Sequence, residues 1–355
     1  MAFVLPNFSK AEVNRAGDIL AARLAGMPVE LEELEKWVWA SDVLANWRAC
    51  HLYPINTFQA TLRSRLKRID PKAIVAQRLK RAPSVIAKLQ RFHTMKLAQM
   101  QDIGGLRAVV RSVAAVRRLD AIYREGSLAH KLVSSKDYIA EPKRDGYRSV
   151  HIVYQYQSAV APSYNGLLLE LQLRTKLQHA WATAVETMGT FLGQALKSGQ
   201  GERRWRSFFE IASAAITHLE KTAPIPGFEA LSRQEVFSRL AEAEQDLHVL
   251  TKLSGFSLAA NQILAQKGVG SFHLVVLDST KRTVNIRPFP STQLEAASAA
   301  YSQIEERGRQ GEQVEAVLVS AGPVEALRKA YPNYFLDTHD FVTTIRRVIT
   351  EAGGS

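Results

Sequence analysis

Apolar and polar positions recur along the chain with two periods, and the changes of period mark out the elements. Spacing near 3.6 residues predicts helices, whereas runs of β-branched and aromatic residues predict strands. Helices are expected at 9–26, 30–49, 56–69, just after Pro83-Ser84, and at 113–125, 175–196, 231–266, 291–308, 323–330 and 338–350, with 203–268 helical apart from a break at 224–227. Strands are expected at 73–77, 106–111, 149–156, 167–173, 272–278, 282–287 and 314–320. Helices lying between strands predict an α/β (α+β) fold, a mixed sheet flanked by helices.

The order of these elements divides the chain into four regions. We expect an N-terminal helical region at 1–69, an α/β core at 70–200, a helical extension or linker at 201–270, and a small ββαβα domain at 271–355. Residues 102–105 are interpreted as a turn and 126–146 as a loop.

Composition limits the class of protein. The 355 residues include one cysteine, Cys50, which excludes an internal disulfide and a cysteine zinc cluster and is typical of a reducing cytosol. We expect a cytoplasmic protein without a membrane span, because no run of eighteen apolar residues occurs. The net charge is +12, and residues 60–150 hold 21 Lys and Arg against 7 Asp and Glu. Such a concentration of positive charge predicts a polyanionic partner, a nucleotide, a nucleic acid or both.

The densest candidate chemistry is the stretch KDYIAEPKRDGYRSVH at 136–151. Gly146 permits a sharp turn, Tyr147 then offers a face for stacking, and the surrounding cations can neutralise phosphate oxygens. A solvated basic turn before a strand is the competing interpretation.

Two acidic positions flank this stretch. Asp102 precedes one strand and Glu170 lies inside another, an arrangement suited to holding Mg²⁺ on ATP phosphates. Glu170 can alternatively act as a base towards a hydroxyl. In LLLELQLR the residues Glu170, Gln172 and Arg174 alternate, which predicts that all three share one face of the sheet.

The segments QDIGGLRAVV, KDYIAEPKRDGYRSVH and ELQLRT, in this order, resemble the synthetase domain of the RelA/SpoT alarmone synthetases, a nucleotidyltransferase-like fold. The resemblance covers roughly 70–190. It implies transfer of the β,γ-pyrophosphate of ATP to a ribose 3′-hydroxyl, with Mg²⁺ and ATP as cofactors. It also implies roles for individual residues. Asp102 and Glu170 would hold the metal, Tyr147 would stack on the acceptor base, and these three form the predicted catalytic set. ATP would be bound by Arg78, Lys80, Ser84, Lys88 and Arg107, and the acceptor by Lys143, Tyr147, Arg148, His151, Gln172 and Arg174.

The chain departs from that pattern in two places. The hydrolase half of the long enzymes is missing, which predicts a single-function small synthetase. Glu186-Thr187 stands where the family has Glu-His, and this departure argues against an ordinary guanosine-nucleotide acceptor. The C-terminal ββαβα unit with Tyr331-Pro-Asn-Tyr334 resembles the CapRel group of fused toxin–antitoxin proteins. There a zinc-finger-like domain without zinc carries a Tyr-x-x-Tyr element that docks on the toxin, so Tyr331 and Tyr334 are the predicted regulatory residues.

Two functions remain open for the sequence. The first is a CapRel-like toxin that pyrophosphorylates the 3′-terminal adenosine of tRNA in anti-phage defence, with a phage protein as trigger and with Arg63, Arg65, Lys67 and Arg68 on the tRNA. The second is an alarmone synthetase that makes guanosine penta- or tetraphosphate from GDP or GTP. A catalytically inactive binding module ranks below both, because an acidic or basic residue is present at every position where the chemistry requires one. We expect neither DNA nor a membrane as a partner.

Overall fold

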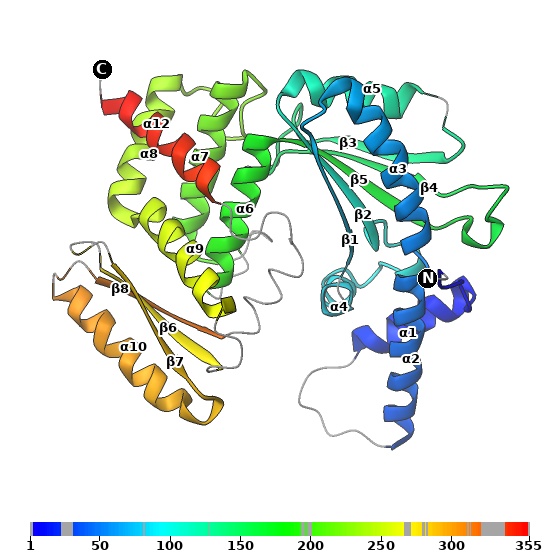
Figure 1. The fold of residues 1–355 in the computed structure, drawn as a ribbon, viewed down its shortest axis with the longest axis horizontal. Helices are drawn as coiled ribbons and strands as arrows, with labels where there is room; N and C mark the ends of the chain where they lie inside the picture. The colour runs from blue at the N-terminus through cyan, green and yellow to red at the C-terminus, as the bar shows by residue number, and fades with distance from the viewer. Residues whose placement is uncertain are drawn as a thin grey trace. The chain divides into compact units, whose positions relative to one another are not determined.

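The computed structural model describes residues 3–22, 31–80, 82–126, 128–192, 196, 201–265, 271–278, 281, 283–310, 312, 314–320 and 338–353. They belong to two compact units, which are described separately (Figure 1). The first unit is Met1–Tyr138 with Ser149–Thr175, and the second is Ile139–Arg148 with Lys176–Ser355. Within the described residues, none of the helices is both long and apolar enough to cross a membrane.

The first unit is built on a five-stranded sheet. Its strands are β1 (Ile74–Leu79), β2 (Gly104–Val110), β3 (Lys131–Asp137), β4 (Val150–Gln155) and β5 (Leu168–Thr175), in the order β1-β2-β5-β4-β3. β2 and β5 are parallel, and the other neighbouring strands pair antiparallel. The predicted mixed sheet is therefore confirmed.

The helices of this unit are α1 (Lys10–Ala22), α2 (Leu31–Ala49), α3 (Leu52–Ile69), α4 (Ala82–Arg91) and α5 (Val113–Glu125), with 3₁₀ turns η1 (Leu97–Gln99) and η2 (Pro162–Tyr164). α3 and α5 contact each other and the central strands. Their apolar stripes, with Leu62, Leu66, Val116 and Leu119, are buried. Burial of such a stripe against a sheet is the main source of stability for both layers.

Three predictions about local structure in this unit are wrong. α3 begins at Leu52 rather than 56, because Pro54 lies in the first turn, where a missing N–H removes no helical hydrogen bond. β2 already begins at Gly104, inside the expected turn. The expected loop 126–146 contains β3, an edge strand that is mostly exposed and polar and so lacks the apolar alternation of a half-buried strand.

The second unit contains a helical core and a small sheet. The helices are α6 (Lys176–Phe191), α7 (Arg203–Glu220), α8 (Arg233–Leu247), α9 (Val249–Ala265) and α12 (His339–Gly353). Their buried side chains form one cluster that includes Trp181, Phe208, Phe237, Leu253 and Phe341.

The single helix expected at 231–266 is in fact two helices. His248 takes the left-handed conformation with φ of 50°, and its N–H still bonds to the Glu244 carbonyl 2.8 Å away. The Glu244 carboxylate then accepts a hydrogen bond from the Leu250 amide at 3.0 Å, which satisfies an N-terminal donor of α9. The apolar spacing continues across the break, so the pattern alone concealed it.

The small sheet contains β6 (Phe272–Asp278), β7 (Thr283–Phe289) and β8 (Val314–Ser320) in the antiparallel order β7-β6-β8. α10 (Leu294–Arg309), preceded by the 3₁₀ turn η4 (Ser291–Gln293), packs on β6 and β8. The β, β, α, β order agrees with the expected unit. α12 packs instead on α6, α8 and α9. The predicted helix 323–330, together with Tyr331 and Tyr334, lies outside the described residues.

Candidate active site

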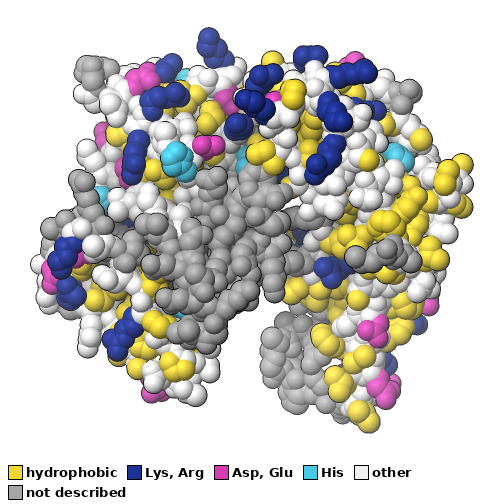
Figure 2. Space-filling view, in the orientation of Figure 1, with side chains coloured by type: hydrophobic (Ala, Val, Ile, Leu, Met, Phe, Trp, Pro, Cys, Tyr) yellow, Lys and Arg dark blue, Asp and Glu magenta, His cyan; other side chains and the backbone are white. Residues whose placement is uncertain are grey.

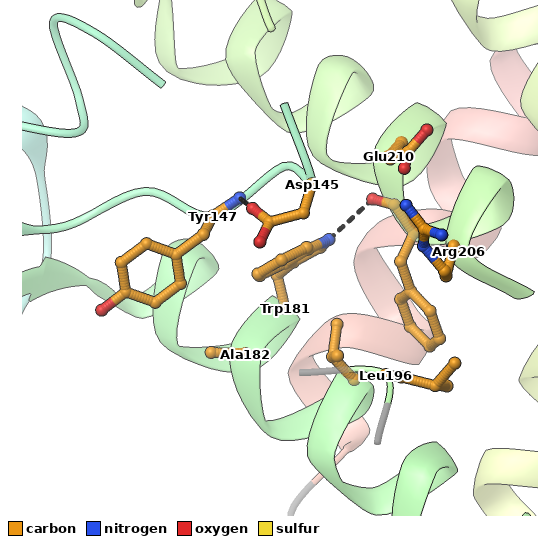
Figure 3. A pocket seen from close by; sticks show the side chains of 9 residues that line it. Asp145, Tyr147, Trp181, Ala182, Leu196, Arg206 and Glu210 are labelled. Carbon is orange, nitrogen blue, oxygen red and sulfur yellow. Dashed lines mark hydrogen bonds between the residues drawn. The ribbon is translucent and has the colours of Figure 1, made fainter. Parts of the chain in front are cut away.

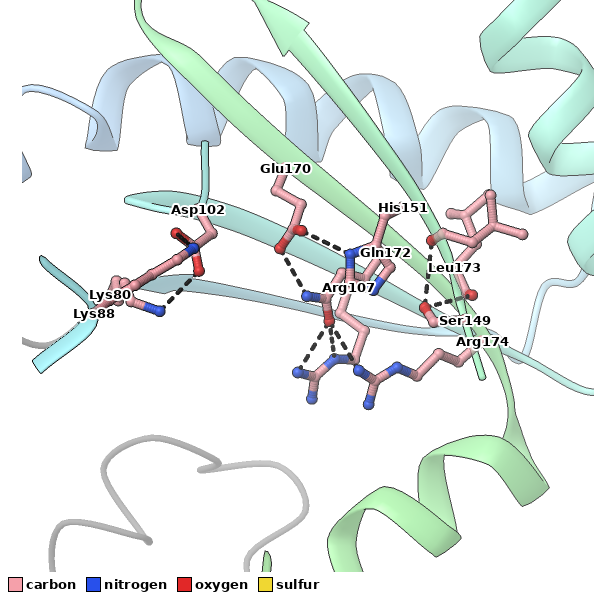
Figure 4. Close-up of polar contacts among 11 residues, drawn as sticks. Lys80, Lys88, Asp102, Arg107, Ser149, His151, Glu170, Gln172, Leu173 and Arg174 are labelled. Carbon is pink, nitrogen blue, oxygen red and sulfur yellow. Dashed lines mark hydrogen bonds and ion pairs between the residues drawn. The ribbon is translucent and has the colours of Figure 1, made fainter. Parts of the chain in front are cut away.

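Two lysines hold the Asp102 carboxylate in the first unit (Figure 4). Lys80 directly follows β1 and Asp102 shortly precedes β2, and the Lys80 amide bonds to the Ile103 carbonyl at 2.8 Å, so the antiparallel pairing brings the two side chains together. Lys80 Nζ lies 2.8 Å from Asp102 Oδ2, and Lys88 Nζ of α4 lies 3.0 Å from Oδ1. Both carboxylate oxygens therefore have a positively charged partner.

A second polar cluster crosses the centre of the same sheet. Arg107 of β2, Gln172 of β5 and His151 of β4 lie opposite one another in the strand registers. His151 Nδ1 lies 2.8 Å from Glu170 Oε1, and Gln172 Nε2 donates to Glu170 Oε2 at 2.7 Å. The predicted shared face is confirmed for Glu170 and Gln172 (Figure 4).

Both arginines of this cluster converge on one amide. Arg107 Nε and Nη2 lie 3.4 Å from Gln172 Oε1, and Arg174 Nη2 lies 3.2 Å from the same oxygen. Two guanidinium groups on one neutral oxygen form a concentrated positive site, which suits an anionic or planar ligand. The predicted ATP residue Arg107 thus lies beside Gln172 and Arg174, predicted for the acceptor, so members of the two predicted sets are in contact.

The pKa values of the two carboxyl groups are lowered. Burial acts to raise the pKa of Asp102, but the charges and hydrogen bonds of Lys80 and Lys88 outweigh it. Burial likewise acts to raise the pKa of Glu170, yet His151, Gln172 and the charge of Lys88 bring it to about 2. A general base works best with a pKa near the working pH, so in this arrangement Glu170 is suited to holding a cation rather than to accepting a proton.

These residues fit the magnesium ion that the family resemblance implies. Mg²⁺ prefers oxygen ligands, and the carboxylates of Asp102 and Glu170 supply them. The charge of Lys88 lowers the pKa of both carboxyl groups, so both already interact with a cation. Among the described residues no group of three or more acidic, His or Cys side chains forms a complete cage. Mg²⁺ commonly keeps substrate phosphates among its ligands, so Asp102 and Glu170 would hold the ion together with ATP, and the bound ion would neutralise phosphate charge.

Two further predicted ATP residues are placed only in part. Ser84 lies in the first turn of α4, one helical turn before Lys88 and on the same side of the helix. Arg78 lies opposite Gly105 in the β1–β2 register, but its side chain is outside the described part of the structure.

The loop with Tyr147 belongs to the second unit. Gly146 has φ of 87°, which confirms the predicted sharp turn. The Tyr147 amide donates to Asp145 Oδ1 at 3.0 Å, and Lys143 Nζ lies 5.1 Å from the centre of the Tyr147 ring. The ring is half-buried and packs against the helical cluster. It is therefore a supported platform rather than a free tip.

Arg148 is held inside the second unit. Its side chain is 1% exposed, and it donates to Ser213 Oγ at 3.1 Å and to Glu220 Oε2 at 3.0 Å. Acceptor binding by Arg148 stays a prediction, and the observed contacts are those of an anchor. Ser213 and Glu220 were not singled out from the sequence, because they lie 65 and 72 positions away on a helix with no recognisable motif.

A small cavity adjoins Tyr147 and Trp181 (Figure 3). Asp145 comes from the loop, Ala182 from α6, and Arg206 and Glu210 from α7. Its enclosed space is about 20 Å³, room for roughly one water molecule. The cavity is therefore too small to hold a nucleotide base.

The four basic residues predicted for tRNA lie on α3. Arg63, Lys67 and Arg68 are exposed. Arg65 instead stacks over the Tyr123 ring, with its guanidinium carbon 4.5 Å from the ring centre. Figure 2 shows Lys and Arg side chains gathered over α3 and α5. The exposed members of this surface include Arg111 and Arg118.

Comparison with known proteins places the sheet and the loop in one family region. The family described as "Region found in RelA / SpoT proteins" matches residues 77–189. GTP pyrophosphokinase YjbM of Bacillus subtilis is 31% identical over 176 residues, covering 48% of this chain and 79% of that protein. GTP pyrophosphokinase YwaC of the same organism is 25% identical over 119 residues, covering 32% and 56%. The crystal structure of B. subtilis small alarmone synthetase 1 bound to its product pppGpp has 27% identity and a TM-score of 0.39, covering 48% of this chain and 91% of that one.

Proposed function

Because the chain belongs to the RelA/SpoT family and is a pyrophosphotransferase, we propose that it transfers pyrophosphate from ATP to the 3′-hydroxyl of the tRNA 3′-terminal adenosine, as in the CapRel group. The observation that carries the chemistry is the Asp102 carboxylate between Lys80 and Lys88, beside the polar row that begins at Glu170. Pyrophosphate transfer requires charge neutralisation and in-line positioning more than covalent catalysis. This cluster supplies both signs of charge for a metal-bound triphosphate.

Lys80 and Lys88 have two partners in this mechanism. Without nucleotide they neutralise Asp102, at 2.8 and 3.0 Å. If Mg²⁺ binds together with ATP, Asp102 would hold the metal, and Lys80 and Lys88 would then be available to the phosphates. Metal and nucleotide would then favour each other's binding, because Mg²⁺ would free the two lysines for the phosphates and the phosphates would hold the lysines away from Asp102.

Two features support tRNA as the acceptor. Thr187, at the position where the family resemblance expects histidine, is 1% exposed inside α6 and cannot contact a nucleotide as a surface histidine would. The exposed cations of α3 and α5 form a surface wider than one nucleotide needs (Figure 2). Contacts between such cations and phosphates give affinity without sequence preference.

A second candidate is synthesis of guanosine tetra- or pentaphosphate from GDP or GTP. It is favoured by the relatives themselves, since both matched Bacillus subtilis proteins are named GTP pyrophosphokinases. The charged and polar groups of the sheet would serve either acceptor equally, because both present a ribose 3′-hydroxyl.

Incubation with γ-labelled ATP and either bulk tRNA or GDP and GTP separates the two. We expect label on the tRNA 3′ end and little labelled guanosine nucleotide. With four to six phosphates neutralised, tRNA affinity should fall with a slope of about four or five against salt on logarithmic axes. Replacing Arg63, Lys67 and Arg68 with Gln should flatten that slope. Efficient turnover of GDP with tRNA unlabelled would reverse the assignment.

Control by the C-terminal region is part of the proposal. Tyr331 and Tyr334 would dock on the synthetase domain and close it, and a phage protein would bind the zinc-finger-like C-terminal domain and open it. Two partly buried aromatic rings can supply a few kcal/mol, enough for a closed population above roughly 99%. The test is growth and tRNA end labelling with wild type and the Tyr331→Ala/Tyr334→Ala variant, with and without phage. Identical behaviour of both proteins would place the switch elsewhere.

A further inference from the structure

Helix α7 lies outside the matched family region 77–189, yet it holds the Tyr147 loop. Ser213 Oγ of α7 donates to the Gly146 carbonyl at 2.6 Å. The same hydroxyl accepts from Arg148 Nε at 3.1 Å. One α7 side chain therefore fixes the residues on both sides of Tyr147.

The second contact is a buried ion pair. Arg148 Nη1 lies 3.0 Å from Glu220 Oε2 at the end of α7, and the two side chains are 1% and 8% exposed. Gln178 Nε2 of α6 donates to the same carboxylate oxygen at 3.0 Å. A buried pair contributes little net stability, but loss of one partner leaves an uncompensated charge and is strongly unfavourable. Such a pair defines one position for the loop.

The backbone of the loop lies directly against α7. A Cβ atom built on Gly146 would be 2.8 Å from Ser213 Cβ and 3.1 Å from Trp181 Cζ2. Trp181 Nε1 in turn donates to the Phe209 carbonyl of α7 at 2.8 Å, which ties α6 to α7 beneath the loop. Displacement of α7 would therefore carry the loop with it.

We propose that Ser213 and Glu220 of α7, supported by Gln178 of α6, are positioning residues for the acceptor: through Gly146 and Arg148 they set the place of the Tyr147 ring on which the acceptor base stacks. This inference rests on the proposed transfer to a ribose hydroxyl and on the stacking role that the family resemblance implies for Tyr147. If the inference holds, the functional synthetase extends beyond the matched region 77–189 to include α7. The inference also identifies Arg148 as a structural link between the stacking platform and the helices of the second unit.

The test compares four variants of the full chain. Glu220→Gln removes the charge and keeps the shape, and Ser213→Ala removes two hydrogen bonds without leaving a buried charge. Glu202→Gln is the matched control, because Glu202 is an exposed carboxylate at the start of α7. Tyr147→Ala reports on the platform itself. KM and kcat are measured separately for ATP and for the acceptor, with bulk tRNA and with GDP, and circular dichroism and melting temperature report on folding.

We expect Glu220→Gln and Ser213→Ala to raise the acceptor KM about tenfold while the ATP KM stays within about twofold, since a small misplacement of a positioning group is felt only by its own substrate. Glu202→Gln should match wild type. If Glu220→Gln lowers the melting temperature so far that it is unfolded in the assay, Ser213→Ala decides.

Failure of the positioning role and failure of the stacking role give different results. A raised acceptor KM for Tyr147→Ala with unchanged values for Ser213→Ala and Glu220→Gln would overturn the positioning role and leave the stacking role standing. An unchanged acceptor KM for Tyr147→Ala would overturn the stacking role and this inference together. Equal rises in the KM of ATP and of the acceptor would mean a general structural role and would also overturn it.

Discussion

The sheet cluster and the loop anchor hold charged side chains in opposite ways. On the sheet, Asp102 and Glu170 are partly accessible, and their partners come from the end of β1 (Lys80), from helix α4 (Lys88) and from the neighbouring strand β4 (His151). Beneath the loop, Arg148 is fully buried and is paired with one helix from much later in the chain. Partly solvated charges can exchange partners at small cost, whereas a buried pair cannot. The charges on the sheet are therefore suited to changing partners, and the charge of the loop anchor is suited to staying in place.

The largest effect should come from removing a carboxylate on the sheet. We expect Asp102→Asn and Glu170→Gln each to lower magnesium-dependent transfer by about a hundredfold or more, because each would remove a proposed metal ligand and leave nearby cations unbalanced. Initial rates over a magnesium titration measure this. Asp18→Asn is the control, since Asp18 also pairs with a lysine, Lys96, but at the surface. Full activity in both site variants at ordinary magnesium would contradict the metal cradle.

Removal of the Tyr147 ring should have the next largest effect. Stacking of a base on an aromatic side chain contributes about 1–3 kcal/mol, so Tyr147→Ala should lower kcat/KM for the acceptor by roughly 5- to 150-fold. The ring also packs against the helical cluster, so a modest fall in melting temperature should accompany it. Tyr147→Phe keeps the face and should retain most activity. Equal losses in both variants would point to the hydroxyl instead.

The contrast between the two regions also explains what the sequence could predict. Glu170 and Gln172 were placed on one face because side chains alternate along a strand, and that rule is local. The sharp turn at Gly146 was predicted for the same kind of reason. Both features depend only on residues two or three positions apart in the sequence, so they can be predicted without knowledge of the fold.

The anchor of the loop could not be predicted in this way. Ser213 and Glu220 look like ordinary helix residues, and only tertiary packing brings them to Arg148. The same physical reason accounts for β3, which pairs at the sheet edge with no apolar alternation, and for the break at His248, which a side-chain cap stabilises. Long-range pairing and capping decide these cases, and neither is visible in local periodicity.

If Lys88 leaves Asp102 when the metal binds, removing Lys88 should change the affinity for metal, an effect smaller than the two losses of activity above. Lys88→Gln removes a cation that competes for Asp102, so Mn²⁺ should bind the nucleotide-free protein about tenfold more tightly, the size of one charge-assisted hydrogen bond. Titration of the free metal signal by electron paramagnetic resonance measures it. Lys96→Gln, which removes a surface partner of Asp18, should leave the affinity unchanged. Weaker Mn²⁺ binding in Lys88→Gln would show that the lysine organises the carboxylate rather than competing for it.

The smallest effect concerns acid stability and tests whether the sheet charges are paired at rest. The pKa of Glu170 is about 2 in the folded protein, because His151 and Gln172 hold its charged form against the opposing effect of burial. A group whose folded pKa lies below its unfolded value stabilises the fold at neutral pH, and that contribution disappears as the pH falls from about 4.5 towards 2. Glu170→Gln has no such group, so wild type should lose more unfolding free energy over this interval than the variant. We expect a difference on the order of 1–3 kcal/mol, since each unit by which the pKa is lowered corresponds to about 1.4 kcal/mol. Urea unfolding at several pH values, with Asp18→Asn as reference, measures it. Parallel pH profiles for wild type and Glu170→Gln would mean that Glu170 is not held by His151 at rest, and the sheet would then differ from the loop anchor in burial alone.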